Sequence, residues 1–553
     1  MAADAHFDAV VVGSGFGGSV TAFRLAEAGM SVLVLERGKS YPPGSFPRTP
    51  WDMAHNFWDP SEGLHGLFDV WSFRGLGGIV ASGLGGGSLL WSNVVLRKDA
   101  STFVREEGEY WPVTYDDLEP HYERHERMLK ATPYPFRQAP YDRTYKTKAM
   151  EYASAQVGLE WFLPPLAVAF DPGDGAPRPG QPLQGEPPNL HDATRLTCLL
   201  CGECNIGCNF GSKNTLDYNY LSRATLDHGA QIRTRCEVKT FAPREGGGFV
   251  VDYVDHAHAV EGEKRPRPLP TNRITCDRLV LAAGSFGTTF LLLKNRAAFP
   301  KLSRRLGTHF CGNGDLLTLA VRARENGRPR IVDAGYGPAI TSTVRVKDKA
   351  EGGPGRAYYV QDGGHPPLVD WIVETSYQLA VIRRALRVGK RLAKKLLRLD
   401  HRSDIGREIA AFFDSDLTGS SIPFFSMGRD LPNGNMRLTD DGYLDVDWRK
   451  RKHDPPFDDI RRTAKQMADA LDAKLFDNPA WYLSRVITVH PVGGCPMGRD
   501  ETEGVVDSYG RVFGYPGLII ADGSTLPGPV GPNPSTTIAA LAHRFAERTI
   551  AEA

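Results

Sequence analysis

A histidine and an asparagine near the C-terminus are the side chains whose type and context best suit chemistry. His490 opens the glycine-rich stretch His-Pro-Val-Gly-Gly-Cys, and Asn533 stands between Pro532 and Pro534. Histidine exchanges a proton near neutral pH, and a neutral amide both donates and accepts hydrogen bonds. Together they could remove a proton from a substrate and hold its oxygen. Taken alone, each has a structural alternative, a core histidine bonded to backbone and an Asn-Pro turn.

Four cysteines form a second set of chemistry-bearing residues. Cys198, Cys201, Cys204 and Cys208 have the spacing C-x2-C-x2-C-x3-C, which matches the bacterial ferredoxin run except that Asn209 replaces the following proline. Closely spaced thiolates converge on soft metals, but in two-cluster ferredoxins the fourth cysteine serves the other cluster, and no second run exists here. An iron–sulfur cluster, a zinc ion and plain thiols that shape a turn all stay open.

The element that must position a cofactor lies at the N-terminus. Gly13, Gly15 and Gly18 follow the apolar run 9–12 with the spacing G-x-G-x-x-G. This order predicts a buried strand, a tight turn that lets backbone approach a pyrophosphate, and a helix N-terminus that attracts anions. The sequence therefore predicts a dinucleotide site.

An acidic residue completes this motif. The predicted helix 19–28 leads to a second apolar run, 31–35, which ends in Glu36. An acid at this distance from the glycines is placed to bind ribose hydroxyls. Its carboxylate would repel a 2′-phosphate, which argues against NADP but does not separate FAD from NAD.

Other segments extend the prediction to a doubly wound α/β domain. The buried strand and glycine turn at 278–287, followed by a helix at 288–294, form a second strand–turn–helix unit. A glycine-rich loop spans 81–93, and 39–80 is expected to be an irregular loop or lid. We assign 1–110, 195–315 and 484–553 to the cofactor domain, and 111–194 and 316–483 to an α+β substrate domain with lid segments.

Composition narrows the class of protein. The chain has 553 residues, enough for two or three domains, and a formal net charge of +1, which gives no basis for nucleic-acid binding. The first strand begins within a few residues, so no signal peptide is expected, and no apolar stretch approaches the roughly 20 residues of a membrane span. We therefore expect a cytoplasmic protein with free thiols.

With these motifs placed, the chain resembles the glucose–methanol–choline (GMC) oxidoreductase family, and within it the bacterial cholesterol oxidases that hold FAD noncovalently. The resemblance rests on 12–22, 85–88, 281–288, 490–495 and 510–540. It implies FAD rather than NAD, and it implies His490 and Asn533 as the catalytic residues. The implied cofactor-binding residues are Gly13, Gly15, Phe16, Gly17, Gly18, Glu36, Arg37, Gly85, Gly86, Gly87, Ser88, Asn93, Val238, Ala283, Gly284, Asp522, Gly523, Asn533 and Pro534.

The resemblance also implies an activity, the FAD-dependent oxidation of a hydroxysteroid or another apolar secondary alcohol, with hydride passing to flavin N5 and His490 as base. The electron acceptor would be oxygen, a quinone or an acceptor protein. Two alternatives stay open: a dehydrogenase of sugar or aminoglycoside hydroxyls, and an FAD/iron–sulfur electron-transfer protein. Cholesterol oxidases also isomerise the steroid with a glutamate, but the matching segment has Gln361 and Asp362 instead. Isomerisation is therefore in doubt.

A strongly cationic segment, residues 379–399, lies within the predicted substrate domain. Residues 379–399 carry eight lysines and arginines and no acid, with leucine and isoleucine at helical intervals. This pattern predicts an amphipathic helix that could contact an anionic membrane surface or an acidic acceptor protein. Its structural alternative is an ordinary solvated helix over the substrate domain.

Overall fold

A computed structural model describes residues 5–106, 109–263, 269–364, 419–448, 454–482 and 484–553. The predicted cationic helix at 379–399 lies outside the described residues. In the described ranges, no helix is both long enough and apolar enough to cross a membrane.

The first of two large sheets contains the N-terminal motif. Its parallel strands lie in the order β12 (Gln231–Arg233), β2 (Val32–Leu35), β1 (Ala5–Val12) and β15 (Thr271–Leu281). The second half of β15 continues this order by pairing in parallel with β26 (Leu518–Ile520). Its first half pairs with an antiparallel hairpin, β14 (Phe249–Asp255) and β13 (Cys236–Pro243). Strands with all side chains buried, such as β2, are typical of such parallel sheets.

Four helices pack together beside this sheet, although they come from distant parts of the chain. They are α1 (Phe16–Glu27), α3 (Tyr115–Leu129), α5 (Tyr220–Leu226) and α13 (Ser535–Ala551). Tyr122 on α3 makes a hydrogen bond of 3.0 Å to Thr537 on α13, and Tyr220 on α5 makes one of 2.9 Å to His543. The expected boundaries of the first βαβ unit are thus confirmed to within a few residues.

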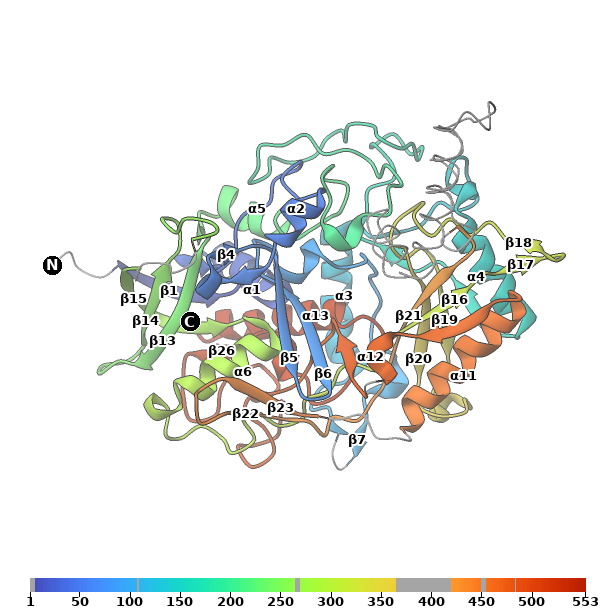
Figure 1. Ribbon diagram of the computed structural model, residues 1–553. Coiled ribbons are helices and arrows are strands. Elements are labelled where there is room, and N and C mark those ends of the chain that lie inside the picture. Colours follow the sequence, from blue (N-terminus) through green and yellow to red (C-terminus); the bar gives the residue numbers. More distant parts are fainter. Residues whose placement is uncertain (1–4, 107–108, 264–268, 365–418, 449–453, 483) are drawn as a thin grey trace, which may run out of the picture.

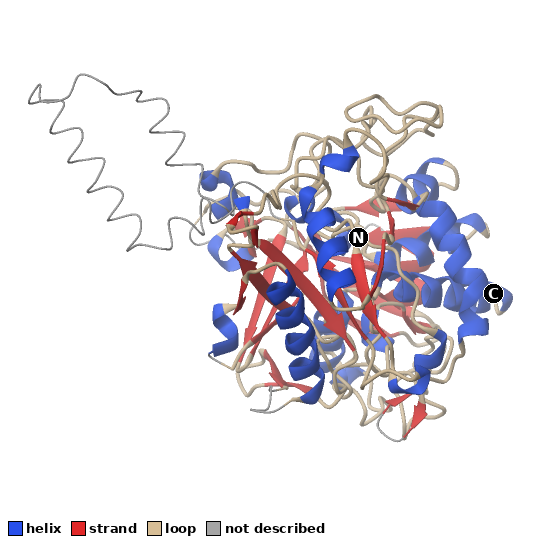
Figure 2. Ribbon diagram, turned by 90° about the vertical axis from the view of Figure 1, so that its right-hand side faces the viewer, coloured by secondary structure: helices blue, strands red, loops and turns tan. Residues whose placement is uncertain are grey.

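The second large sheet lies at the other end of the molecule (Figure 1). Its antiparallel strands have the order β10 (Glu160–Phe162), β19 (Thr343–Val346), β20 (Tyr358–Asp362), β21 (Ile422–Gly428), β16 (Leu316–Val321) and β24 (Lys474–Asp477). Helices α4 (Tyr145–Gln156) and α11 (Pro455–Ala470) cover one face with a core that includes Met150, Val360 and Phe457. Figure 2 shows the strands running through the middle of the molecule with helices beside them.

Residues 39–80, expected to be irregular, contain regular structure. Strands β5 (Phe68–Phe73) and β6 (Leu76–Ala81) form a hairpin, and β25 (Val486–Thr488) adds to β6 in parallel. The glycines and tryptophans of this segment suggested a loop, but an aromatic cluster with Phe286 holds the hairpin in place, with Trp71 and Phe73 within 5.6 and 5.3 Å of that ring. The segment therefore forms a separate three-stranded sheet with β25, which ends two residues before His490.

The remaining helices and strands are short, apart from α6 with 11 residues. They are α2 (Pro50–Ala54), β3 (Trp58–Asp59), β4 (Leu64–His65), β7 (Arg105–Glu106), β8 (Glu109–Tyr110), β9 (Thr132–Pro133), β11 (Pro165–Leu166), α6 (Gly284–Lys294), β17 (Arg324–Glu325), β18 (Arg328–Pro329), β22 (Asn435–Leu438), β23 (Leu444–Asp447) and α12 (Pro479–Tyr482). The fold is thus α/β, with a Rossmann-like domain and a second α+β domain, as predicted.

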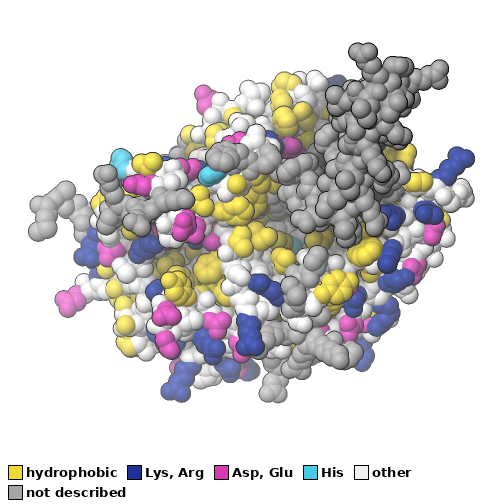
Figure 3. All heavy atoms as spheres, in the orientation of Figure 1, with side chains coloured by type: hydrophobic (Ala, Val, Ile, Leu, Met, Phe, Trp, Pro, Cys, Tyr) yellow, Lys and Arg dark blue, Asp and Glu magenta, His cyan; other side chains and the backbone are white. Residues whose placement is uncertain are grey.

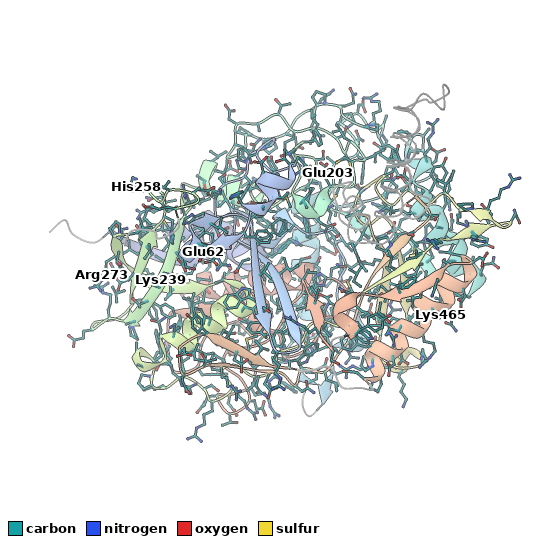
Figure 4. All side chains as sticks on the ribbon, in the orientation of Figure 1. Glu62, Glu203, Lys239, His258, Arg273 and Lys465 are labelled. Carbon is teal, nitrogen blue, oxygen red and sulfur yellow. The ribbon has the colours of Figure 1, made fainter. Side chains whose placement is uncertain are left out.

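Charge is spread over the surface rather than concentrated. Lys239 and Arg273 project at the β13–β15 end of the molecule, and Lys465 projects from α11 at the opposite end (Figure 4). On the face drawn in Figure 3, acidic and basic side chains are interspersed over the lower half. This distribution agrees with the near-zero net charge.

Candidate active site

Ser14 and Glu36 tie the N-terminal glycine turn to the second glycine loop. The Ser14 backbone amide and hydroxyl donate to Glu36 Oε2 at 3.0 and 2.6 Å, and the Gly38 amide donates to Oε1 at 2.8 Å. The Ser14 hydroxyl oxygen also accepts from the Gly85 amide at 3.0 Å. The structure therefore brings together Glu36 and both glycine segments, as a dinucleotide site requires.

The two glycine segments touch so closely that side chains would not fit. Gly86 has a φ of +53°, and a methyl group on it would lie 2.6 Å from the Gly15 Cα. On Gly15 itself, by contrast, a methyl group would meet nothing within 4 Å. Gly15 is also the N-cap of α1, where no side chain caps the helix. Open space beside bare helix amides fits the pyrophosphate of a dinucleotide.

Several buried polar atoms nearby have no hydrogen-bond partner among the residues that the structure describes. Both amide atoms of Asn93 are buried and unbonded, and so are the hydroxyls of Ser535 and Thr536 in the first turn of α13. Buried polar groups are almost always hydrogen-bonded, so these atoms fit a site that a polar cofactor completes. The helix begins directly after Asn533 and Pro534, and its N-terminus favours negative charge there.

Asp522 joins the start of α6 to the C-terminal loop. It accepts from the Gly284 amide at 2.9 Å, the Thr288 hydroxyl at 2.5 Å and the Ser524 amide at 2.8 Å. Burial raises the pKa of Asp522, and these hydrogen bonds oppose that shift. The residue therefore holds the backbone of Gly284 and Ser524 in place, and both oxygens of its carboxylate accept from protein donors.

The other predicted cofactor residues have varied surroundings. Arg37 forms an ion pair of 2.5 Å with Asp69 and lies over the Trp58 ring, so its guanidinium is engaged by protein. Phe16 packs edge-on against Trp91 with ring centroids 4.9 Å apart. Val238 is buried in β13, the Ala283 amide donates to the Thr288 hydroxyl, and the Ser88 hydroxyl donates to the Gly85 carbonyl.

His490 is oriented by a carboxylate that the sequence analysis missed. Its Nδ1 lies 2.7 Å from Asp315 Oδ1. Asp315 Oδ2 accepts from the Thr488 hydroxyl at 2.9 Å and from the backbone amides of Val489 and His490 at 2.8 and 3.1 Å. Because a carboxylate only accepts, Nδ1 carries a proton, and in the neutral imidazole this leaves a lone pair on Nε2. In the described part of the chain, Nε2 makes no hydrogen bond, so it is free to act as a base.

Asn533 lies on a loop that is held in place by the short segment that also carries Asp315. The fully buried Asn313 accepts from the amides of Val530 and Gly531 at 2.8 and 3.1 Å and donates to the Pro532 carbonyl at 3.0 Å. Asn313 and Asp315 are two residues apart. One short turn therefore positions both His490 and the loop that carries Asn533.

A buried lysine holds this loop from another side. Lys98 Nζ donates to the Pro529 carbonyl at 3.1 Å and lies 4.5 Å above the Trp111 ring. Burial lowers the pKa of Lys98 to about 7. In sequence, only the run Gly312-Asn-Gly-Asp315 before an apolar strand hinted at a special turn; nothing singled out Lys98.

Asp362, one of the two residues in the segment that matches the isomerising glutamate, is occupied by structural contacts. It is fully buried and accepts from the amides of Thr341 and Ser342 at 2.9 and 2.7 Å, and from the Thr341 hydroxyl. Lys146 Nζ, also fully buried, lies 3.5 Å from its Oδ2. The carboxylate is therefore held as a structural anion.

The four clustered cysteines line one cavity of about 20 Å³. They are free thiols, and within the described ranges no group of three or more His, Cys, Asp or Glu side chains is arranged to hold a metal ion. Burial raises the pKa of Cys201 to about 12 and that of Cys198 well above its ordinary value, whereas a metal ligand must lose its proton. The iron–sulfur and zinc hypotheses thus gain no support.

The cysteine segment is bonded to the second glycine loop. Lys213 Nζ is buried and donates to the carbonyls of Leu89, Trp91 and Cys204 at 2.9 to 3.0 Å. Asn205 adds a hydrogen bond of 3.1 Å to the Leu90 carbonyl. This arrangement favours the third alternative, in which the thiols shape a turn that supports the cofactor loop.

Asp430 is bonded to the turn at 311–315, and the pH dependence of the protein's stability tests its protonation state. Burial raises its pKa from 3.8 to about 7, and its Oδ2 accepts from the Gly312 amide at 2.9 Å. Between these pH values the folded state holds a proton that the unfolded state has released, so the free energy of unfolding falls as pH rises. We expect Asp430→Asn to remove a pH-dependent loss on the order of a few kcal/mol.

Urea unfolding at pH 5 and pH 8 measures this difference. Asp440→Asn, at an exposed position, serves as the control and should keep the wild-type difference between the two pH values. If Asp430→Asn keeps that difference as well, Asp430 does not carry a raised pKa.

Comparison with protein families agrees with this geometry. Residues 430–542 match the model described as GMC oxidoreductase, and residues 11–44 match an NAD(P)-binding Rossmann-like domain. The first match contains His490 and Asn533, and the second contains the N-terminal glycines and Glu36.

Relatives match over nearly the whole chain. A cholesterol oxidase from Mycobacterium tuberculosis is 31% identical, with 98% of this chain and 90% of the relative covered. One from Acinetobacter baumannii is 28% identical, covering 97% and 93%. A long-chain-alcohol oxidase from Arabidopsis thaliana is 22% identical, covering 98% and 67%. The solved structure of pyridoxine 4-oxidase from Mesorbium loti shares the fold, with a TM-score of 0.55, 16% identity and 98% of each chain covered.

Proposed function

Because the chain belongs to the GMC oxidoreductase family, we propose that it is an FAD-dependent oxidase of a hydroxysteroid or a similarly apolar secondary alcohol. The enzyme acts on the CH–OH group of an alcohol, as its relatives do. The observation that carries the mechanism is the hydrogen bond of 2.7 Å between Asp315 and His490. It leaves one basic nitrogen, His490 Nε2, for a hydroxyl proton.

The chemistry divides between the chain and the cofactor. His490 Nε2 takes the hydroxyl proton, Asp315 stabilises the imidazolium that forms, and Asn533 holds the alcohol oxygen. FAD, when bound, supplies an acceptor for the hydride that leaves the alcohol carbon. The residues that would hold it are the glycine turn around Gly15, the loop 85–88, Glu36, Asn93 and the first turn of α13.

The substrate class is supported by the face of the second sheet that is turned away from α4 and α11. Cross-strand pairing places Phe425, Leu317, Leu319 and Phe162 on this face. Leu317 is 42% exposed and the other three are half-buried. An apolar face of this kind suits a steroid or hydrocarbon better than a sugar, whose hydroxyls would lose their hydration there. The cholesterol oxidases named above match this class.

The test is anaerobic reduction of the purified protein. We expect a two-band flavin spectrum that a 3β-hydroxysteroid bleaches and that glucose leaves unchanged. Admission of oxygen should restore the oxidised spectrum and release hydrogen peroxide, as an oxidase requires. Bleaching by glucose alone would favour the sugar dehydrogenase. A flavin that dithionite reduces but no alcohol does would overturn the proposal.

A further inference from the structure

Three histidines lie together among the four helices that pack beside the first sheet. His121 and His125 are about one turn apart on α3, and His543 lies on α13. The rings of His121 and His543 stack with centroids 6.4 Å apart. All three residues are buried, with at most 5% of their surface exposed. These residues, called the histidine cluster below, have no role in the mechanism proposed above.

A tyrosine from another helix bonds two of these rings to each other. The Tyr220 hydroxyl on α5 lies 3.2 Å from His125 Nδ1 and 2.9 Å from His543 Nε2. A hydroxyl has one proton, so it donates to one ring and accepts from the other. This arrangement needs one bare ring nitrogen. If both imidazoles were charged, both nitrogens would donate, and the hydroxyl proton would have no acceptor between the two rings.

The remaining ring nitrogens offer no place for a second proton either. His121 Nδ1, His125 Nε2 and His543 Nδ1 are buried and have no hydrogen-bond partner in the described part of the chain. In an imidazolium both nitrogens donate. Protonation would therefore leave buried, charged donors without acceptors, which is costly.

The charged side chains around the cluster are mostly positive. Glu547 of α13 is the acid that faces it, with Oε2 3.7 Å from His121 Nε2, but its side chain is 52% exposed. Three arginines face the cluster from α1, α3 and α13, namely Arg24, Arg124 and Arg544. The surroundings therefore disfavour further positive charge.

Burial keeps all three rings neutral near pH 7. It lowers the pKa of His121 to about 4, with the arginines adding to the shift and Glu547 opposing it. It lowers the pKa of His125 to about 3 and the pKa of His543 well below its ordinary value. A change of structure that let water reach the cluster would return these rings to the ordinary histidine pKa of about 6.5.

The helices around the cluster are also the helices whose N-termini border the cofactor site. The His125 ring packs against the ring of Phe16, the first residue of α1, with centroids 6.2 Å apart. Helix α13, which carries His543, begins with the unpaired hydroxyls of Ser535 and Thr536. Moving α1 or α13 away from α3 would therefore disturb the site.

We propose that the histidine cluster is an acid-sensitive switch for cofactor retention, in which protonation separates α3 from α1 and α13 and weakens the binding of FAD. The closed state holds the rings neutral, and the opened state lets them take up protons. Below about pH 6.5 the opened state binds more protons than the closed one, so acid favours opening. The inference rests on the FAD of the proposed function, but not on the alcohol chemistry.

The first test measures FAD release from the full-length holoenzyme as the pH is lowered from 7.5 to 4. The rise in flavin fluorescence gives the dissociation constant at each pH. Uptake of one proton on release raises that constant about 10-fold per pH unit. We expect a rise of 10-fold or more per unit between pH 6 and pH 4.5. A dissociation constant that does not change with pH in this range would overturn the inference, and no variant is needed to see it.

The double variant His125→Gln/His543→Gln tests whether the protons belong to the cluster. Glutamine both donates to and accepts from Tyr220 but does not titrate. The pH at which half of the FAD is released should fall by about 0.5 unit or more. The matched control is His228→Gln, which removes a half-buried histidine that contacts Phe23 of α1. This control should release FAD at the wild-type pH.

Release of FAD by the double variant at the wild-type pH would also overturn the inference. Circular dichroism and thermal unfolding at pH 7.5 check that the variants fold. If the double variant does not, His121→Gln should show a smaller shift in the same direction. If the wild-type protein binds no FAD, the proposed function fails. The pH midpoint of acid unfolding, which should fall in the same variants, then decides whether the cluster senses acid.

Discussion

Replacing His490 with alanine is expected to slow flavin reduction by an alcohol about 10²- to 10⁴-fold, the range that a positioned base contributes. The reason is that the lone pair on Nε2, held in place from Nδ1 by Asp315, would be lost. FAD should stay bound at full occupancy, because no cofactor-holding contact described above involves the imidazole. Stopped-flow mixing under anaerobic conditions measures the rate, and the visible spectrum measures the occupancy.

His309→Asn provides the control for His490→Ala. His309 is half-buried on a neighbouring segment, bonds to Thr308, and has a φ of +63° that asparagine tolerates. The flavin of the His309→Asn enzyme should be reduced by the alcohol at the wild-type rate. A His490→Ala enzyme that is reduced as fast as wild type would remove His490 from the mechanism.

The second large effect is expected at Asp315, where replacement by asparagine should slow flavin reduction more than replacement by alanine. Three donors converge on Asp315 Oδ2, so the single oxygen of an asparagine would stay there and its amino group would face His490 Nδ1. Nδ1 would then have to accept, the ring proton would move to Nε2, and the base would be blocked. We expect reduction to slow by about 10²- to 10⁴-fold, as for other histidines held in the wrong tautomer.

Asp315→Ala separates this tautomer effect from a loss of position. Without a partner, Nδ1 can carry the proton or not, so a fraction of the enzyme should keep an active base. Single-turnover rates should therefore rank wild type above Asp315→Ala above Asp315→Asn. The reverse order of the two variants would mean that Asp315 acts only by placing the ring.

The local part of this site was predictable from sequence, and the part that depends on long-range contacts was not. The strand, turn and helix at Gly13–Gly18 and the acid at Glu36 follow from short patterns, because each element is made by adjacent residues. Asp315, Asn313 and Gln361 bond to residues that are 172 to 219 positions away, and no local periodicity reports such a contact. The glycines and tryptophans of residues 39–80 likewise led to the prediction of a loop where the structure has β5 and β6. The stability of these strands comes from aromatic packing against Phe286.

The metal hypothesis shows a different limit of spacing arguments. The cysteine run has a ligand-like spacing, yet its thiols are buried around a small cavity, and burial raises the pKa values of Cys198 and Cys201. Spacing alone does not reveal the direction of a side chain or the cost of ionising it. Here the surroundings of Lys213 and Asn205 indicate what the segment does, which is to support the loop at 85–93.

The turn at 311–315 runs without interruption into β16, which carries Leu317 and Leu319 on the apolar face. Asp315, which orients the base His490, and the side chains that would contact the substrate therefore lie on one continuous segment. A mutation that reshapes β16 to admit a new substrate would also disturb the orientation of His490. The edge strand β10 follows α4 in the chain and the edge strand β24 follows α11, so neither continues from that turn. Directed evolution of substrate range should thus accumulate its tolerated changes at Phe162 and Phe476, at the margins of the sheet, while β16 stays nearly fixed.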